Sequence, residues 1–201
     1  MTSNKTDIYV YAHWKGMSEP KIMGILSAHQ AKGKKAFSFE YDKEWLKSDQ
    51  KFLLDPDIQL FGGAQYPNQK INFGIFLDSM PDTWGRTLMK RRAVLEAKDK
   101  GVKAPILYDI DYLLGVYDES RMGALRFKLN PEGEFLDSDK ATSTPPWSSI
   151  RELQNAAAHI EKDDDEESKK WLAVLMAPGS SLGGARPKAN ILDHDKSCWI
   201  A

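Results

Sequence analysis

The chain has 201 residues, of which 41% are hydrophobic and 28% are charged, and its net charge is −1. This composition is typical of a folded, soluble protein of one or two domains and argues against a disordered chain. The near-zero net charge excludes a protein-wide basic surface, so contact with nucleic acid would need a local patch. Cys198 is the single cysteine, which excludes an internal disulfide and favours a reducing, cytoplasmic location.

The sequence carries no metal or membrane signal. The N-terminal segment MTSNKTDIYVYAHW has no long apolar core, so we expect no signal peptide. No stretch approaches about 18 consecutive apolar residues, so we expect neither a membrane span nor a membrane partner. The histidines lack the spacing of metal ligands, so we predict no metal site at His13, His29, His159 or His194.

The first part of the chain has the period-two pattern of strands. Ile8, Val10 and Ala12 share one face of a predicted strand over residues 7–14. The same pattern predicts, in chain order, a strand over residues 21–28, a turn at residues 32–34, a strand over residues 37–41 and a short helix over residues 41–49. The three strands predict a β-meander.

Helical spacing follows. Residues 71–80 begin as a strand and run into a helix over residues 81–100, with Pro81 at its first position and Asp82 in its first turn. Next come a helix that ends near Gly115, a hairpin with Asn130–Gly133 as its turn, and a polar linker over residues 137–149. After the linker we predict a helix capped by Ser149 and Glu152, a solvated acidic turn over residues 161–170 and a helix over residues 168–177. The last predicted elements are two strands around a turn at residues 193–196. These elements predict an α+β fold with domains over residues 1–140 and 141–201.

Residues 177–193, APGSSLGGARPKANILD, leave two interpretations open. Gly179 and Gly184 have the spacing of a Walker A loop, but Ala185 follows where that loop has lysine, and the protein-kinase template G-x-G-x-x-G does not match either. The pattern alone therefore favours a plain connection between a helix and a strand. In the other interpretation, adjacent glycines let backbone N–H groups approach an anion, with hydroxyl donors and positive charge nearby from Ser180, Ser181, Arg186 and Lys188.

The predicted helix over residues 81–100 and the segment after it are basic. Between Arg86 and Lys103 there are seven basic and two acidic residues. The functional interpretation is a contact with DNA phosphates or an acidic partner through Arg86, Lys90, Arg91 and Arg92. The alternative is a solvated helix face.

Three segments carry a family resemblance. Residues 79–92, SMPDTWGRTLMKRR, contain a Pro-Asp-x-Trp-Gly-Arg core, and residues 112–127, YLLGVYDESRMGALRF, contain a Gly-Ala-Leu-x-Phe strand. Residues 179–191, GSSLGGARPKANI, form the third segment. In order and spacing they resemble the HipA-like serine/threonine kinases, the toxin half of bacterial toxin–antitoxin pairs. The resemblance covers roughly residues 73–201.

The resemblance implies a β-rich N-terminal subdomain, a meander or small barrel with helices, followed by the start of a kinase-like N-lobe. It implies ATP and magnesium as cofactors of the complete kinase, and a protein serine as the phosphate acceptor. The best-known target of the family is glutamyl-tRNA synthetase, an aminoacyl-tRNA synthetase. The implied partner is a helix-turn-helix antitoxin that sits on operator DNA.

The family's loop residues transfer onto matching positions of this chain. Gly183, Gly184, Ala185 and Lys188 match the loop that lies over the ATP phosphates. The implied site of autophosphorylation is Ser181, with Ser180 as the neighbouring alternative. The phosphate adds about −1.5 to −2 charge, which would repel the ATP phosphates, and in the family this modification ejects the loop and silences the kinase.

The chain also departs from the family. It ends at CWIA, where the strand lysine that pairs with the ATP phosphates should follow, and it holds no catalytic aspartate or magnesium ligands. We therefore expect an N-terminal fragment that has no catalytic residue and binds ATP weakly or not at all. The alternative is a non-catalytic interaction module that binds a helix-turn-helix antitoxin or DNA.

Overall fold

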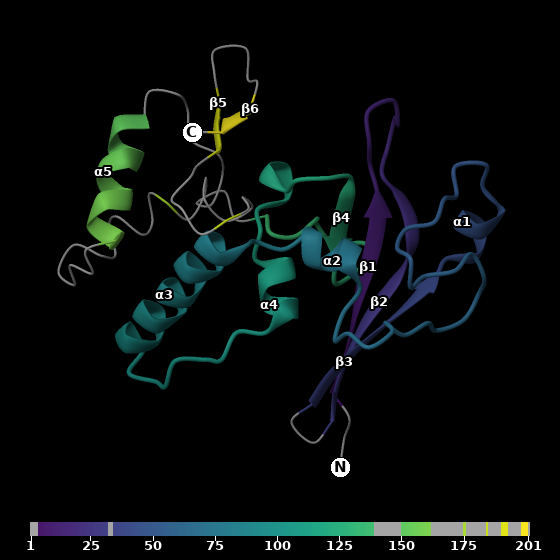
Figure 1. The fold of residues 1–201 in the computed structure, drawn as a ribbon, viewed down its shortest axis with the longest axis horizontal. Coiled ribbons are helices and arrows are strands. Elements are labelled where there is room, and N and C mark those ends of the chain that lie inside the picture. Colours follow the sequence, from purple (N-terminus) through teal and green to yellow (C-terminus); the bar gives the residue numbers. More distant parts are fainter. Residues whose placement is uncertain are drawn as a thin grey trace. The chain divides into compact units, whose positions relative to one another are not determined.

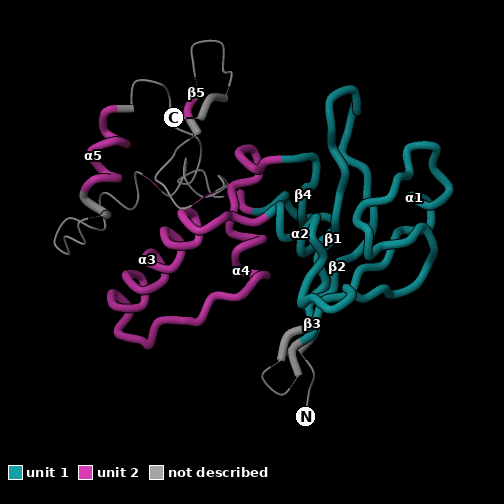
Figure 2. The backbone as a smooth tube through the Cα atoms, viewed as in Figure 1, with its two compact units in different colours: residues 1–79, 123–136 teal, residues 80–122, 137–201 magenta. Residues whose placement is uncertain are grey.

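The computed structural model of the protein describes residues 4–31, 34–138, 150–161, 175, 184, 190–192 and 198–200. The chain divides into two compact units (Figure 2). Unit 1 comprises Met1–Ser79 and Gly123–Leu136, and unit 2 comprises Met80–Met122 and Asp137–Ala201. The domain boundary predicted after residue 140 falls outside the described residues, so that division stays a prediction.

Unit 1 is built on a four-stranded antiparallel sheet in the order β3-β2-β1-β4 (Figure 1). Its strands are β1 (Asn4–Ala12), β2 (Lys21–Ala31), β3 (Lys34–Tyr41) and β4 (Leu125–Lys128). The first three strands pair in sequence order, which confirms the predicted meander. The predicted short helix is also confirmed as α1 (Lys43–Lys47).

The alternation in β1 defines the buried face of the sheet. Ile8, Val10 and Ala12 are fully buried, as their spacing predicts. The core of unit 1 continues through aromatic rings from distant parts of the chain. The Phe76 ring lies 5.5 Å from the Phe39 ring and 6.3 Å from the Phe127 ring, measured between centroids. Burial of these rings stabilises this unit.

The predicted strand at the start of residues 71–80 is wrong, because this segment forms the short helix α2 (Gly74–Asp78). Phe73 and Phe76, three residues apart, are both fully buried, and that spacing suits one side of a helical turn. The N-cap residue of this helix, Phe73, has no side-chain group that could accept a hydrogen bond from the first turn. The Ile75 N–H instead donates to Asp55 Oδ2 over 2.9 Å, a cap supplied from 20 residues earlier in the chain.

Removing this distant cap is expected to lower the stability of unit 1. Asp55 is buried, and its other oxygen accepts a hydrogen bond from the Asp57 N–H. The substitution Asp55→Ala should therefore lower the free energy of unfolding by about 2 kcal/mol, the upper range for loss of a helix cap. Urea denaturation measures the effect, and Asp49→Ala at an exposed position is the control. Equal midpoints for the two variants would contradict the capping role.

The predicted hairpin over residues 121–136 is half right. The turn exists, because the Gly133 N–H donates to the Asn130 carbonyl over 2.9 Å. The strand before it, β4, pairs with β1 along four residues, and no strand follows the turn among residues 129–138. The segment after the turn is joined to β4 by the Leu136 N–H, which donates to the Phe127 carbonyl over 2.9 Å, but it does not continue as a strand.

Unit 2 is largely helical in its described part. It contains α3 (Thr83–Asp99), α4 (Asp109–Leu114), the 3-10 helix η1 (Asp118–Ser120), α5 (Ile150–Glu161), β5 (Asn190–Leu192) and β6 (Cys198–Ile200). The three predicted α-helices are confirmed at α3, α4 and α5, and β5 pairs with β6 as predicted. Helix α4 ends at its C-cap Gly115. The described parts of both units together confirm an α+β fold.

Two details of unit 2 differ from the prediction or lie beyond it. Helix α3 begins two residues later than predicted, since Asp82 is its N-cap and Pro81 precedes the cap. Pro81 therefore does not occupy the first helical position. The predicted cap Ser149, the acidic turn and, except for Leu175, the helix over residues 168–177 lie outside the described residues.

Candidate functional site

The glycine-rich loop is represented in the structure by one residue, Gly184. Its backbone φ is +92°, a conformation that favours glycine. The other predicted residues of this loop lie outside the described residues: Ser180, Ser181, Gly183, Ala185 and Lys188.

Gly184 is held by the start of helix α3. The Gly184 N–H donates to Asp82 Oδ2 over 2.6 Å, and the Trp84 N–H donates to the Gly184 carbonyl over 3.0 Å. Asp82 and Gly184 are 102 residues apart in sequence. The Pro-Asp-x-Trp-Gly-Arg segment and the glycine-rich segment, separate in the sequence, therefore meet in unit 2. Sequence reasoning missed this contact and assigned Asp82 only to the first turn of a helix.

The Asp82 carboxylate serves two backbone groups. Its Oδ1 accepts from the Thr83 N–H over 2.7 Å, which fixes it at the helix N-terminus, while its Oδ2 accepts from Gly184. The indole of Trp84 is 5% exposed, and its Nε1 has no hydrogen-bond partner among the residues that the structure describes. Trp84 therefore holds this end of α3 by apolar packing, and its backbone N–H supplies the polar contact to Gly184.

Arg86 anchors α3 to α4. Its Nε donates to the Pro81 carbonyl over 2.9 Å, and its guanidinium lies 3.6 Å from the Asp109 carboxylate and 4.5 Å from the centre of the Tyr112 ring. Burial raises the pKa of Tyr112, although the nearby Arg86 charge opposes that rise. These contacts give Arg86 a structural role within unit 2.

The other residues of the predicted basic patch differ in exposure. Arg92 Nε donates to Glu96 Oε1 over 2.6 Å, so its charge is paired along the helix. Lys90 is exposed and Arg91 is half-buried. With Arg86 and Arg92 both engaged by carboxylates, the positive potential of this face is weaker than the sequence count suggests.

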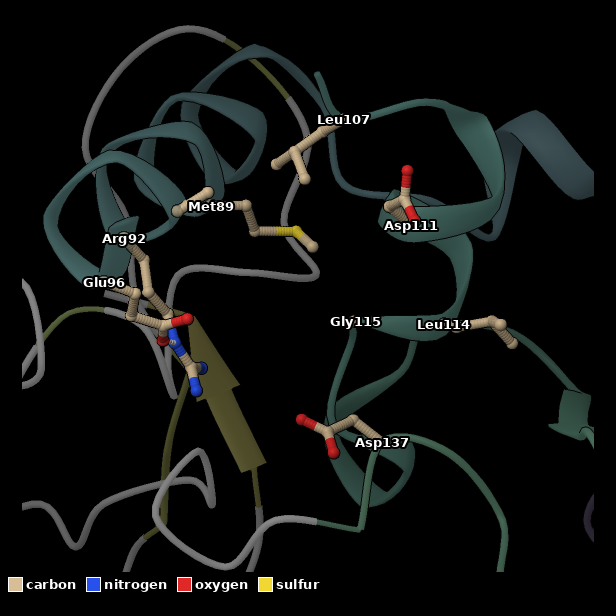
Figure 3. A pocket seen from close by; sticks show the side chains of 9 residues that line it. Met89, Arg92, Glu96, Leu107, Asp111, Leu114, Gly115 and Asp137 are labelled. Atoms are coloured by element: carbon tan, nitrogen blue, oxygen red, sulfur yellow. Dashed lines mark hydrogen bonds and ion pairs between the residues drawn. The ribbon is translucent and has the colours of Figure 1, made fainter. Parts of the chain in front are cut away.

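A cavity of about 390 Å³ lies in unit 2 between α3, α4 and the segment after unit 1 (Figure 3). Met89 and Leu107 point toward one another on one side, and Asp137 lies across from the Arg92–Glu96 pair. Its lining residues are Met89, Arg92, Ala93, Glu96, Leu107, Asp111, Leu114, Gly115 and Asp137. Three carboxylates against one guanidinium make this cavity unsuited to a polyphosphate.

Gly115 keeps one wall of the cavity open. A Cβ at this position would collide with Met89 Cε and would lie 2.9 Å from the Asp111 carbonyl oxygen. The Gly115 backbone itself does not need glycine, because its φ is −88°. The requirement for glycine here is therefore one of space beside Met89.

Arg121 supports the segment next to the cavity. It is 8% exposed and donates to the Val116 carbonyl over 3.0 Å. Burial lowers the pKa of Arg121 to about 10, and the charges of Asp118 and Asp137 act in the opposite direction. The Asp137 N–H also donates to the Val116 carbonyl, over 2.8 Å. Arg121 and Asp137 thus converge on one carbonyl group.

The described part of the chain lacks two other kinds of site. It contains no group of three or more His, Cys, Asp or Glu side chains that could hold a metal ion. None of its helices has the length and apolar character needed to cross a bilayer.

Comparison with protein-family models, curated proteins and solved structures found no significant match to this chain. The kinase-toxin family is therefore a proposal, and its support comes from the three sequence segments and from the contact between Asp82 and Gly184.

Proposed function

We propose that this chain is the N-terminal part of a HipA-like serine/threonine kinase and that unit 2 carries the glycine-rich loop of its nucleotide site. The observation that carries the proposal is the pair of hydrogen bonds between Gly184 and the start of α3. Two of the three segments that resemble the family meet at this point. If the two segments resembled the family only by chance, there would be no reason to expect them to be in contact.

The proposed cofactors are ATP and magnesium, with a protein serine as acceptor. Gly184 fits a loop that lies over phosphates, because its positive φ and missing Cβ allow close backbone approach. Lys188 would add positive charge, and Ser181 or Ser180 would be the regulatory site. The kinase would transfer the terminal phosphate of ATP to the serine hydroxyl of a protein such as an aminoacyl-tRNA synthetase. We also propose a helix-turn-helix antitoxin as the partner of the protein and the cytoplasm as its location.

A phosphotransfer assay with the complete gene product tests the function. With magnesium and radiolabelled ATP, we expect label on protein serine, and we expect Gly184→Ala to lower the rate about 100-fold because it misplaces the loop. Gly101→Ala is the matched control, since Gly101 also has a positive φ but no neighbour near its Cβ position. No phosphotransfer, or equal losses in the two variants, would contradict the proposal.

A second candidate is a non-catalytic module that binds a helix-turn-helix antitoxin or DNA. The cavity beside α3 favours an interaction role, since a lining that combines apolar side chains with three carboxylates suits a basic side chain of a protein better than a phosphate. A module of this kind would bind the antitoxin equally well with and without Gly184→Ala and would show no phosphotransfer.

A further inference from the structure

The Gly184 N–H is already occupied by an internal anion. In a phosphate-binding loop, backbone N–H groups donate to phosphate oxygens. Here the Gly184 N–H donates to the Asp82 carboxylate over 2.6 Å. We propose that the Gly184 amide is an anion-binding position and that Asp82 occupies it, so that Asp82 inhibits phosphate binding at this loop. The proposal rests on the proposed function for its natural ligand, the phosphates of ATP.

The geometry of the contact is that of a strong bond. A distance of 2.6 Å is short even for a charge-assisted N–H···O⁻ hydrogen bond. The Gly184 carbonyl is held as well, by the Trp84 N–H at 3.0 Å. A single N–H cannot make two such bonds, so a phosphate oxygen at this position must displace Asp82 Oδ2.

Displacement would not remove the negative charge from the vicinity. Asp82 Oδ1 accepts from the Thr83 N–H over 2.7 Å, and this cap keeps the carboxylate at the helix N-terminus. A phosphate at the Gly184 N–H would therefore lie close to a carboxylate of the same sign, and the repulsion adds to the lost hydrogen bond.

A positioning role for Asp82 predicts the opposite sign. If the Asp82–Gly184 bond held the loop in its phosphate-binding shape, removing it would weaken phosphate binding. If Asp82 competes with the phosphate, removing it strengthens binding. The direction of the change in affinity therefore separates the two roles.

The experiment uses the complete gene product and compares its Asp82→Ser variant with the unsubstituted protein by titration calorimetry, with magnesium-ATP and, separately, pyrophosphate as ligands. Serine caps a helix as well as aspartate does but is too short and uncharged to replace the bond to Gly184. We expect both ligands to bind Asp82→Ser about tenfold more tightly, the effect of one hydrogen bond to a charged group. Asp99→Asn removes the same charge about 25 Å away along α3 and should leave both affinities unchanged.

The outcomes separate this inference from the proposed function. Unchanged or weaker binding of both ligands by Asp82→Ser overturns the inhibitory role and leaves the nucleotide function standing. Tighter pyrophosphate binding with no advantage for ATP supports the anion position and contradicts the nucleotide function. Absence of binding by either ligand to either protein overturns both.

Discussion

Replacing Gly24 by alanine is expected to lower the free energy of unfolding of unit 1 by about 3 kcal/mol, at the upper range for overpacking. Gly24 lies in β2, opposite Tyr41 of β3 and beside a register shift in the pairing with β1. A Cβ there would collide with the Glu40 carbonyl oxygen and would lie 2.7 Å from Phe39 Cζ. The Glu40 backbone is fixed by the sheet and Phe39 is fully buried, so neither neighbour can move without breaking other contacts.

Hydrogen exchange of the β2 and β3 amides measures this effect within unit 1. Gly62→Ala is the matched control, since a Cβ at Gly62 would meet nothing within 4 Å and should change the exchange rates little. If the β2 and β3 amides of Gly24→Ala exchange no faster than those of Gly62→Ala, the two strands do not approach each other closely at Gly24.

Replacing Arg121 by methionine is expected to destabilise unit 2 by about 3 kcal/mol, the upper range for loss of a hydrogen bond from a charged group, because the half-buried Asp118 and Asp137 also lose the positive charge beside them. The guanidinium is almost fully buried, and Asp118 and Asp137 are the charges that favour its ionised form. Methionine fills a similar volume, so the loss of stability measures mainly the removal of the charge and of the hydrogen bond to Val116, and only to a small extent a change in packing. Because Asp137 lines the cavity, we also expect the cavity wall to shift.

Two further variants make the Arg121 prediction specific. Arg92→Met removes an exposed ion pair with Glu96 and should change stability by less than about 0.5 kcal/mol. Arg121→Lys retains the charge but not the planar donor geometry, so it should fall between wild type and Arg121→Met. The measurement is urea denaturation, monitored by hydrogen exchange of the α4 backbone amides. Equal losses in Arg121→Met and Arg92→Met would refute the buried role of Arg121.

Both regulatory proposals for the loop add negative charge, one through phosphorylation and the other through the Asp82 carboxylate. Phosphorylation of Ser181 or Ser180 would add negative charge three or four residues before Gly184, and Asp82 already places a carboxylate at the Gly184 N–H. Both would oppose the phosphates of ATP by the same electrostatic repulsion. The proposed inhibition by Asp82 needs no modification, so it would act on the unphosphorylated loop.

The candidate site could be predicted from the sequence only in part. The Pro-Asp-x-Trp-Gly-Arg and glycine-rich segments stand out by composition, but nothing in their spacing indicates that they touch. Arg86 and Arg92 looked like members of a free basic patch, and the structure pairs both with carboxylates. The partner of Arg86, Asp109, lies on the next helix, where local charge counting does not connect the two residues.

The sequence by itself determined the elements whose signals are local. Alternating Ile8, Val10 and Ala12 specify β1, and the same alternation of Phe37, Phe39 and Tyr41 specifies β3. Only the tertiary structure decided the helical state of residues 74–78, the pairing of β4 with β1, and the bond between Asp82 and Gly184. Each of these depends on a hydrogen-bond partner brought close by the rest of the fold. Local periodicity records which face of an element is buried, but it does not record which distant group will satisfy its backbone.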